Sequence, residues 1–264
     1  LKNSMACMRK IDIGILRSAQ IKFDLIGDFV LNGRQAPAKN IVSIEDGTLC
    51  YNGEHYDFLC FKPQMPACTF CLYDVVIGVG FHWQRKENQV FKGELHLVVE
   101  DGEVRAINRL SVEDYLVSVI SSEMSATSSL EFLKAHTIIS RSWVYAQLDR
   151  GGLVESARLG YENDDEIVRW YAREDHKTFD FCADDHCQRY QGITRARTEN
   201  VRLAIEATRG LVLVSDGQIC DARFSKCCGG RMEKFSTCWQ DRDYGYLQAL
   251  DDTPDHLAGE CFCN

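Results

Sequence analysis

Asn-Gly and Asp-Gly pairs recur through the first part of the chain, and they constrain the fold more than any other feature of the sequence. They stand at Asn32-Gly33, Asp46-Gly47, Asn52-Gly53 and Asp101-Gly102. Such pairs favour two-residue β-hairpin turns, because both positions readily take positive φ. Residues 11–110 are therefore predicted to be mostly strand. The clearest hairpin joins Leu95–Glu100 to Glu103–Ile107.

Two helix-like segments follow between Leu110 and Leu148. Ser111 with Asp114, and Ser128 with Glu131, are spaced as helix N-terminal capping pairs. The fold class we predict is α+β: a strand-rich N-terminal half with hairpins, a helix-and-strand catalytic half, and a substrate groove between them. We divide the chain into a strand-rich region, 1–90, and a catalytic region, 91–264, with one continuous domain as the alternative.

The charge of the chain limits its partners. Its 264 residues carry a formal net charge of -9, which argues against a nucleic-acid backbone as the main partner. No apolar run approaches the roughly 20 residues of a membrane span. The sequence opens at Leu1 rather than Met, and we expect a targeting segment that lies outside it.

Glu123 is the carboxylate that most resembles a general acid. It lies between the two helix-like segments, after Val119-Ile120-Ser121-Ser122. An apolar setting disfavours the ionised form of a carboxyl group, which suits an acid catalyst. The alternative is a glutamate that merely ends a helix in solvent. Glycoside hydrolysis usually needs two carboxylates, whereas lytic transglycosylation needs one, because the 6-hydroxyl of the sugar replaces water.

A cluster of histidines and cysteines lies further along, in the segment HKTFDFCADDHC. Its candidate ligands are His176, Cys182, His186 and Cys187. Two thiolates and two imidazoles match a tetrahedral zinc site in number and type. Four protein ligands would make the zinc structural. The alternative is a Cys182–Cys187 disulfide beside surface histidines.

The thirteen cysteines leave at least one outside any intramolecular disulfide. Cys227 and Cys228 precede Gly229-Gly230, a pair that permits a tight turn or close backbone approach to a ligand. A plain turn explains the glycines equally well. A nucleophilic cysteine at position 227 or 228 is a rival idea without a local sequence signature.

Several segments together resemble the stage II sporulation protein D family (SpoIID), with its LytB-type amidase-enhancer relatives. The segment LSVEDYLVSVISSEM resembles the family's Leu-Glu-Asp-Tyr-Leu stretch and Ser-Glu-Met box. LEFLKAHTIISRSWVYA resembles its groove-lining helix, and FDFCADDHCQRYQG its Cys-and-His zinc loop. AIEATRGLVL, the CCGGRME box and Gly245-Tyr246-Leu247 are similar to later family segments, in the same order.

The resemblance implies a function and assigns roles. Glu123 matches the catalytic acid/base of a peptidoglycan lytic transglycosylase, which cleaves the MurNAc–GlcNAc β-1,4 bond and leaves 1,6-anhydro-MurNAc ends. The residues expected to bind substrate are Ser122, Lys134, Arg141, Gly229 and Gly230. The residues expected to bind a structural Zn²⁺ are His176, Cys182, His186 and Cys187. The partners are glycan strands in the cell envelope, with a cell-wall amidase as a further candidate. The alternative function is a non-catalytic wall-binding module that stimulates an N-acetylmuramoyl-L-alanine amidase.

Overall fold

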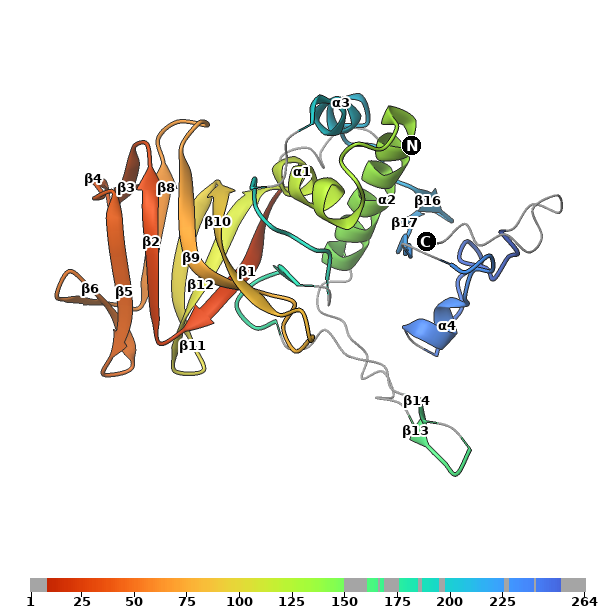
Figure 1. The fold of residues 1–264 in the computed structure, drawn as a ribbon, viewed down its shortest axis with the longest axis horizontal. Coiled ribbons are helices and arrows are strands. Elements are labelled where there is room, and N and C mark those ends of the chain that lie inside the picture. Colours follow the sequence, from red (N-terminus) through yellow and green to blue (C-terminus); the bar gives the residue numbers. More distant parts are fainter. Residues whose placement is uncertain are drawn as a thin grey trace. The chain divides into compact units, whose positions relative to one another are not determined.

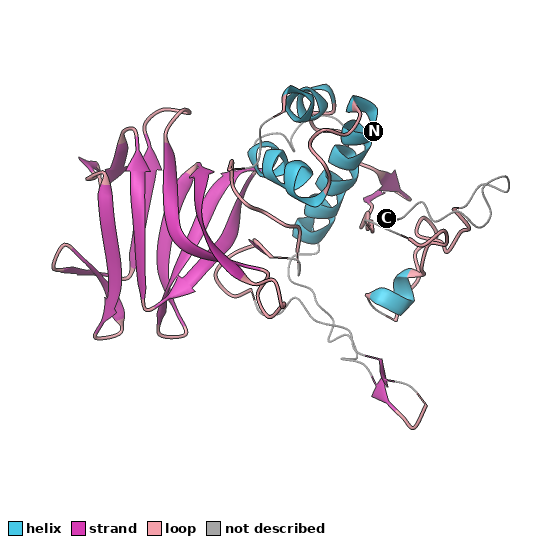
Figure 2. Ribbon diagram, viewed as in Figure 1, coloured by secondary structure: helices cyan, strands magenta, loops and turns pink. Residues whose placement is uncertain are grey.

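The computed structural model describes residues 9–149, 161–165, 167–168, 176–184, 187–194, 198–225, 228–239 and 241–252. The chain forms two compact units. We call Asn3–Thr137 with His176–Gly210 the sheet unit, and Ile138–Asp175 with Leu211–Asn264 and Leu1–Lys2 the C-terminal unit. The predicted α+β class is confirmed: strands dominate the first part of the chain, and helices appear in the later part (Figure 2).

The sheet unit contains two sheets whose strands are mostly antiparallel (Figure 1). The first has the order β15 (Phe181–Cys182), β1 (Lys10–Ser18), β12 (Glu103–Ser111), β11 (Glu94–Glu100), β8 (Phe58–Pro63), β3 (Phe29–Leu31), β4 (Arg34–Gln35). The second has the order β10 (Arg85–Lys92), β9 (Thr69–Ile77), β2 (Gln20–Ile26), β5 (Lys39–Glu45), β6 (Thr48–Tyr51), β7 (Glu54–Tyr56). Strand β10 spans residue 90, so the strand-rich part continues beyond that position.

Aromatic side chains join the two sheets into one core. The ring of Phe61 on β8 lies 5.0 Å from that of Phe23 on β2 and 5.6 Å from that of Tyr51 on β6, centroid to centroid. All three side chains are buried. Burial of large aromatic rings with edge-to-face contacts is a major source of stability in such a core.

The predicted hairpin turns are confirmed. Both residues of all four pairs have positive φ, as in Asp101 (50°) and Gly102 (78°). The Asp101-Gly102 turn joins β11 to β12, whose register pairs Glu100 with Glu103. This positive φ at two successive residues is the geometry that the Asn-Gly and Asp-Gly pairs favour.

Three helices follow the strands: α1 (Val112–Glu123), α2 (Leu130–Asp149) and α3 (Glu199–Ala207). The Ser111 cap of α1 is confirmed, because its hydroxyl accepts a hydrogen bond from the Asp114 amide at 3.1 Å. The predicted cap of α2 at Ser128 was wrong by one residue. The backbone amide of Ser128 instead donates to the carbonyl oxygen of Ser125 in the preceding turn. The hydroxyl of Ser129 accepts the hydrogen bond from the backbone amide of Phe132.

The C-terminal unit contains the later turns of α2 and small elements: β13 (Tyr161–Glu162), β14 (Ile167–Val168), β16 (Val214–Ser215), β17 (Gln218–Ile219) and α4 (Phe235–Cys238). A short hairpin turns at Asp216-Gly217 and pairs β16 with β17. Among the described residues, no helix has the length and hydropathy needed to cross a membrane.

Candidate functional site

Glu123 is the last residue of α1, and its carboxylate is held by a backbone amide. The N–H of Arg189 donates to Oε1 of Glu123 at 2.6 Å. Glu123 is half-buried, and the next residue, Met124, takes an extended conformation that ends the helix. A backbone donor cannot rotate away as a side chain can, so this hydrogen bond fixes the orientation of the carboxyl group.

The segment that supplies this amide is anchored at several points. The amide of Gln191 donates to the Ser118 hydroxyl on α1 at 2.9 Å, and the Tyr190 hydroxyl donates to Asn108 Oδ1 on β12 at 2.6 Å. Gly192, with a φ of 60°, passes so close to strand β10 that a Cβ would collide with the Val90 carbonyl oxygen. The Arg189 amide is therefore placed by contacts to α1, β12 and β10 together.

Ser118→Ala should weaken this anchoring. The variant leaves the buried amide of Gln191 without its acceptor, which typically costs about 1–3 kcal/mol. Chemical denaturation should show this loss as a lower midpoint. Ser121→Ala on the same helix is the matched control, because the Ser121 hydroxyl donates only within α1, to the Val117 carbonyl. Equal stability of the two variants would contradict the anchoring role of Ser118.

A pocket of about 380 Å³ opens at the C-terminal end of α1, and Glu123 itself is not among its lining residues. Its lining includes Ser122, the residue before Glu123, and Arg189, whose amide holds the Glu123 carboxylate. The other lining residues are Ile77, Trp83, Arg85, Ser121 and Gln191. Strand-rich and helical parts of the sheet unit thus contribute to one pocket, and no Asp or Glu stands among its described lining residues.

Trp83, one of the lining residues, belongs to an aromatic loop. The rings of Phe81 and Trp83 stack at a centroid distance of 5.4 Å and an interplanar angle of 15°. The guanidinium of Arg189 lies over the Trp83 ring at 5.4 Å, and Phe81 is half exposed. The arrangement offers a flat apolar surface with adjacent cationic groups.

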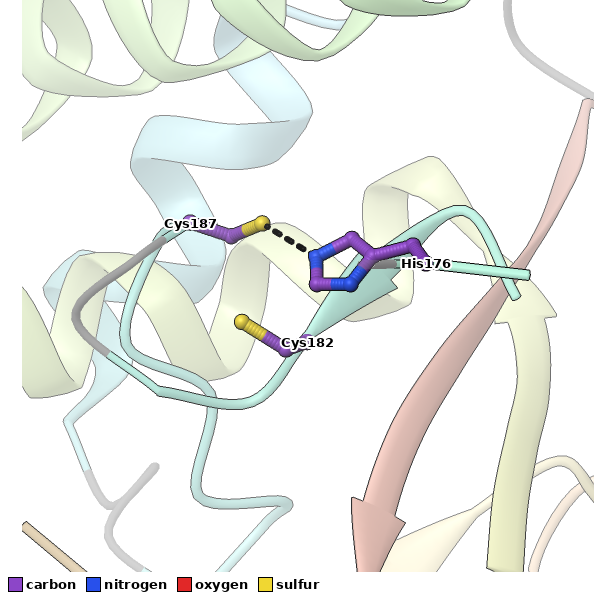
Figure 3. A group of neighbouring side chains, drawn as sticks. All are labelled: His176, Cys182 and Cys187. Carbon is purple, nitrogen blue, oxygen red and sulfur yellow. Dashed lines mark hydrogen bonds between the residues drawn. The ribbon is translucent and has the colours of Figure 1, made fainter. Parts of the chain in front are cut away.

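The predicted histidine–cysteine cluster is assembled in part. The ligand atoms of His176, Cys182 and Cys187 all lie within 4.8 Å of one another, and Nε2 of His176 is 3.3 Å from Sγ of Cys187. Figure 3 shows the imidazole and the two sulfurs turned toward one another. His186, the fourth predicted ligand, lies outside the described residues.

The local fold brings these three ligands together. Strand β15 pairs parallel with β1 and places Cys182 opposite Gly14, while Phe179 covers Gly14 where a Cβ would collide with its ring. Cys182 and Cys187 are both free thiols in this structure, so the alternative disulfide is not formed there. One imidazole and two thiols at this spacing form a donor set that suits zinc.

Buried Tyr115 connects the cluster with Glu123. Its ring stacks on Tyr190 at 5.2 Å and on Phe181 at 6.2 Å, centroid to centroid. Burial, followed by the nearby charges of Cys187, Cys182 and Glu123, raises the pKa of the Tyr115 hydroxyl well above its ordinary value.

The other predicted site residues fall in both units. Lys134, in the sheet unit, pairs with Glu131 at 2.7 Å on α2. Arg141, in the C-terminal unit, is fully buried and donates to the Leu211 carbonyl at 3.2 Å, which supplies the partner that a buried guanidinium needs. In the same unit Gly229 and Gly230 have φ of 67° and 92°. Substrate binding stays a prediction for Lys134, Arg141, Gly229 and Gly230.

Two parts of the site were missed by sequence reasoning. The Arg189 amide carries no side-chain signal, so no residue pattern could have indicated it. Trp83 and Phe81 could have been noticed, because two aromatic residues follow the glycines at 78 and 80 in a short loop.

A comparison with known protein families matches part of the chain. Residues 100–214 match the family model SpoIID, described as stage II sporulation protein. This part of the chain, which includes Glu123 and all the candidate zinc ligands, is a SpoIID family domain. The family is linked to peptidoglycan hydrolysis and acts on the cell wall. No curated protein matches the chain.

Proposed function

We propose that this protein is a lytic transglycosylase that cleaves the MurNAc–GlcNAc β-1,4 bond of peptidoglycan glycan strands. The observation that supports this best is the placement of Glu123: the Arg189 amide fixes its carboxyl group, and its neighbour Ser122 and Arg189 both line a pocket that has no Asp or Glu among its described lining residues. A retaining or inverting hydrolase usually needs a second carboxyl group across the scissile bond. One acid is enough when the substrate supplies its own nucleophile.

The proposed reaction uses Glu123 twice. The protonated carboxyl group first donates its proton to the glycosidic oxygen as the bond from the anomeric carbon to that oxygen breaks. The resulting carboxylate then removes the proton of the MurNAc 6-hydroxyl as that oxygen bonds to the anomeric carbon. The product is a 1,6-anhydro ring, and Glu123 ends the cycle protonated.

The pocket at the C-terminal end of α1 suits a sugar chain. The exposed ring of Phe81, which stacks on the lining residue Trp83, can contact the apolar face of a pyranose ring next to the pocket, and Ser121, Ser122 and Gln191 supply hydrogen-bonding groups. Arg85 and Arg189 add positive charge next to the aromatic loop. The sugar rings and acidic substituents of a glycan strand fit this lining. The net charge of -9, by contrast, disfavours the densely charged backbone of a nucleic acid.

We assign structural zinc to His176, Cys182 and Cys187, with His186 as the fourth ligand. The metal would tie β15 to the loop that leads into Arg189, which is only two residues beyond Cys187. We assign a positioning role to the fully buried Arg141, which holds α2 against the Leu211 carbonyl. The place of action that follows from this function is the cell envelope.

The products should carry 1,6-anhydro ends, one water lighter than hydrolysis products. Purified protein incubated with glycan strands in ¹⁸O-labelled water should release fragments that contain no label, as measured by mass spectrometry. Reducing ends that incorporate ¹⁸O would identify a hydrolase and overturn the proposed chemistry.

Strands that are bound but never cleaved would instead identify the wall-binding alternative. In that case the protein should raise the rate of an added N-acetylmuramoyl-L-alanine amidase on the same strands. Release of anhydro products without any amidase would contradict that alternative.

A further inference from the structure

A second group of metal-ligating side chains lies on the first sheet. Cys60 on β8, with Glu94 and His96 on β11, places one sulfur, one oxygen and one nitrogen within 4.8 Å of one another. Nε2 of His96 is 3.0 Å from Oε2 of Glu94, and Sγ of Cys60 is 3.8 Å from the same oxygen. We propose that these three side chains form a second zinc site, separate from the His176 cluster.

Strand geometry explains why the three donors meet. Glu94 and His96 are two residues apart on β11, so their side chains leave the same face of the sheet. Cys60 is the direct cross-strand partner of His96 in the register of β8 and β11. Cross-strand neighbours have Cβ atoms about 4.5–5.5 Å apart, close enough for both side chains to reach one ion.

The surroundings hold the donors in place. Lys10 pairs with Oε1 of Glu94 at 2.6 Å, which leaves Oε2 on the side of His96 and Cys60. The ring of Phe58 packs edge-on against the His96 imidazole at 5.1 Å. The side chains of His96 and Glu94 are 9% and 15% exposed, so the group is shielded from most of the solvent yet still accessible to it. Outer contacts of this kind orient the ligands of metal sites.

Zinc binding would displace the proton of the Cys60 thiol to solvent as the zinc–sulfur bond forms, as at other thiolate sites.

One polar atom on the same face lacks a partner. Asp12 on β1 and Glu94 on β11 both pair in register with Arg109 on β12, so the three side chains share a face. Arg109 forms an ion pair with Oδ2 of Asp12 at 3.3 Å, whereas Oδ1 of Asp12 is buried and has no hydrogen-bond partner among the described residues.

The donor set indicates which ion would bind. A mixed thiolate, imidazole and carboxylate set suits zinc far better than calcium or magnesium, which prefer oxygen alone. Only three residues of the described chain make up the group, so the fourth position of a tetrahedral ion would hold water. This separates it from the His176 cluster, where two thiols contribute.

Metal stoichiometry of the full chain tests the proposal. Metal-stripped protein is titrated with zinc ions alone, and bound zinc is counted after gel filtration. Wild type should bind two equivalents, Cys60→Ser and Cys182→Ser one each, and the double variant none. Cys71→Ser, which changes a half-buried thiol on β9 outside both groups, is the matched control and should bind two.

Cobalt substitution of the Cys182→Ser variant provides a second readout. Its remaining site should show the charge-transfer absorption of a single cobalt–thiolate bond, and Glu94→Gln or His96→Gln, which removes a direct ligand, should weaken binding at that site by more than the roughly 10- to 100-fold that loss of an outer contact costs. Circular dichroism checks that each variant is folded. Two zinc equivalents retained by folded Cys60→Ser, or no cobalt–thiolate absorption in Cys182→Ser, would overturn the site.

Discussion

Glu123→Gln is expected to lower the rate of glycan cleavage by about 100- to 10,000-fold, the usual contribution of a general acid. Glutamine preserves the size of the side chain, and its amide oxygen can still accept the hydrogen bond from the Arg189 amide. It cannot, however, donate an acidic proton to the glycosidic oxygen. The release of 1,6-anhydro fragments by mass spectrometry measures the loss.

The same substitution at Glu131 is the matched control. Glu131 lies on α2, its side chain is 80% exposed, and it pairs with Lys134. Glu131→Gln should retain wild-type cleavage, and both variants should bind glycan strands and unfold at nearly the same denaturant concentration as wild type. Near-normal turnover by Glu123→Gln would show that the acid is a different residue.

The strand-rich half could be predicted well because its signals are local. The pair Asp101-Gly102 by itself predicts a turn with two positive φ values. The alternation of apolar and polar residues on either side predicts the strands. The α1 cap was found for the same reason, since Ser111 and Asp114 are three residues apart. The α2 cap was missed by one residue because two successive serines, Ser128 and Ser129, give the same local signal.

The candidate site could be predicted only where side chains mark it. Glu123 and the cysteines at 182 and 187 stood out by residue type and by family resemblance, and the structure brings His176 to both cysteines. The contact between Arg189 and Glu123 joins positions 66 residues apart through a backbone atom, which no sequence pattern records.

The group of Cys60, Glu94 and His96 on β8 and β11 could not be predicted from the sequence either. His96 lies within a strand-like segment of the sequence, and no metal-ligand motif surrounds it there. Glu94 lies beside His96 because the two are two residues apart on one strand, but only the register of β8 and β11, which pairs His96 with Cys60, reveals that a thiol lies there too. Strand register depends on how the whole sheet packs, and it is rarely determined by the paired residues alone.

Loss of the His176 cluster is expected to reduce activity through the Arg189 amide. Cys182→Ser removes one of the thiols, and Cys187 lies two residues before Arg189 on the segment that holds Glu123. A displacement of about 1 Å at a catalytic group can cost roughly 100-fold in rate. We therefore expect a smaller loss of cleavage than in Glu123→Gln, together with a lower unfolding temperature.

Hydrogen exchange distinguishes this route from general destabilisation. In Cys182→Ser the amides of residues 187–192 should exchange faster, while those of β2 and β5 in the second sheet should be unchanged, because Gly192, Tyr190 and Gln191 anchor only the segment itself. Cys71→Ser should leave both regions as in wild type. Full activity in Cys182→Ser that has lost its zinc would mean that contacts to α1, β12 and β10 alone position the Arg189 amide, and that the metal is dispensable for Glu123.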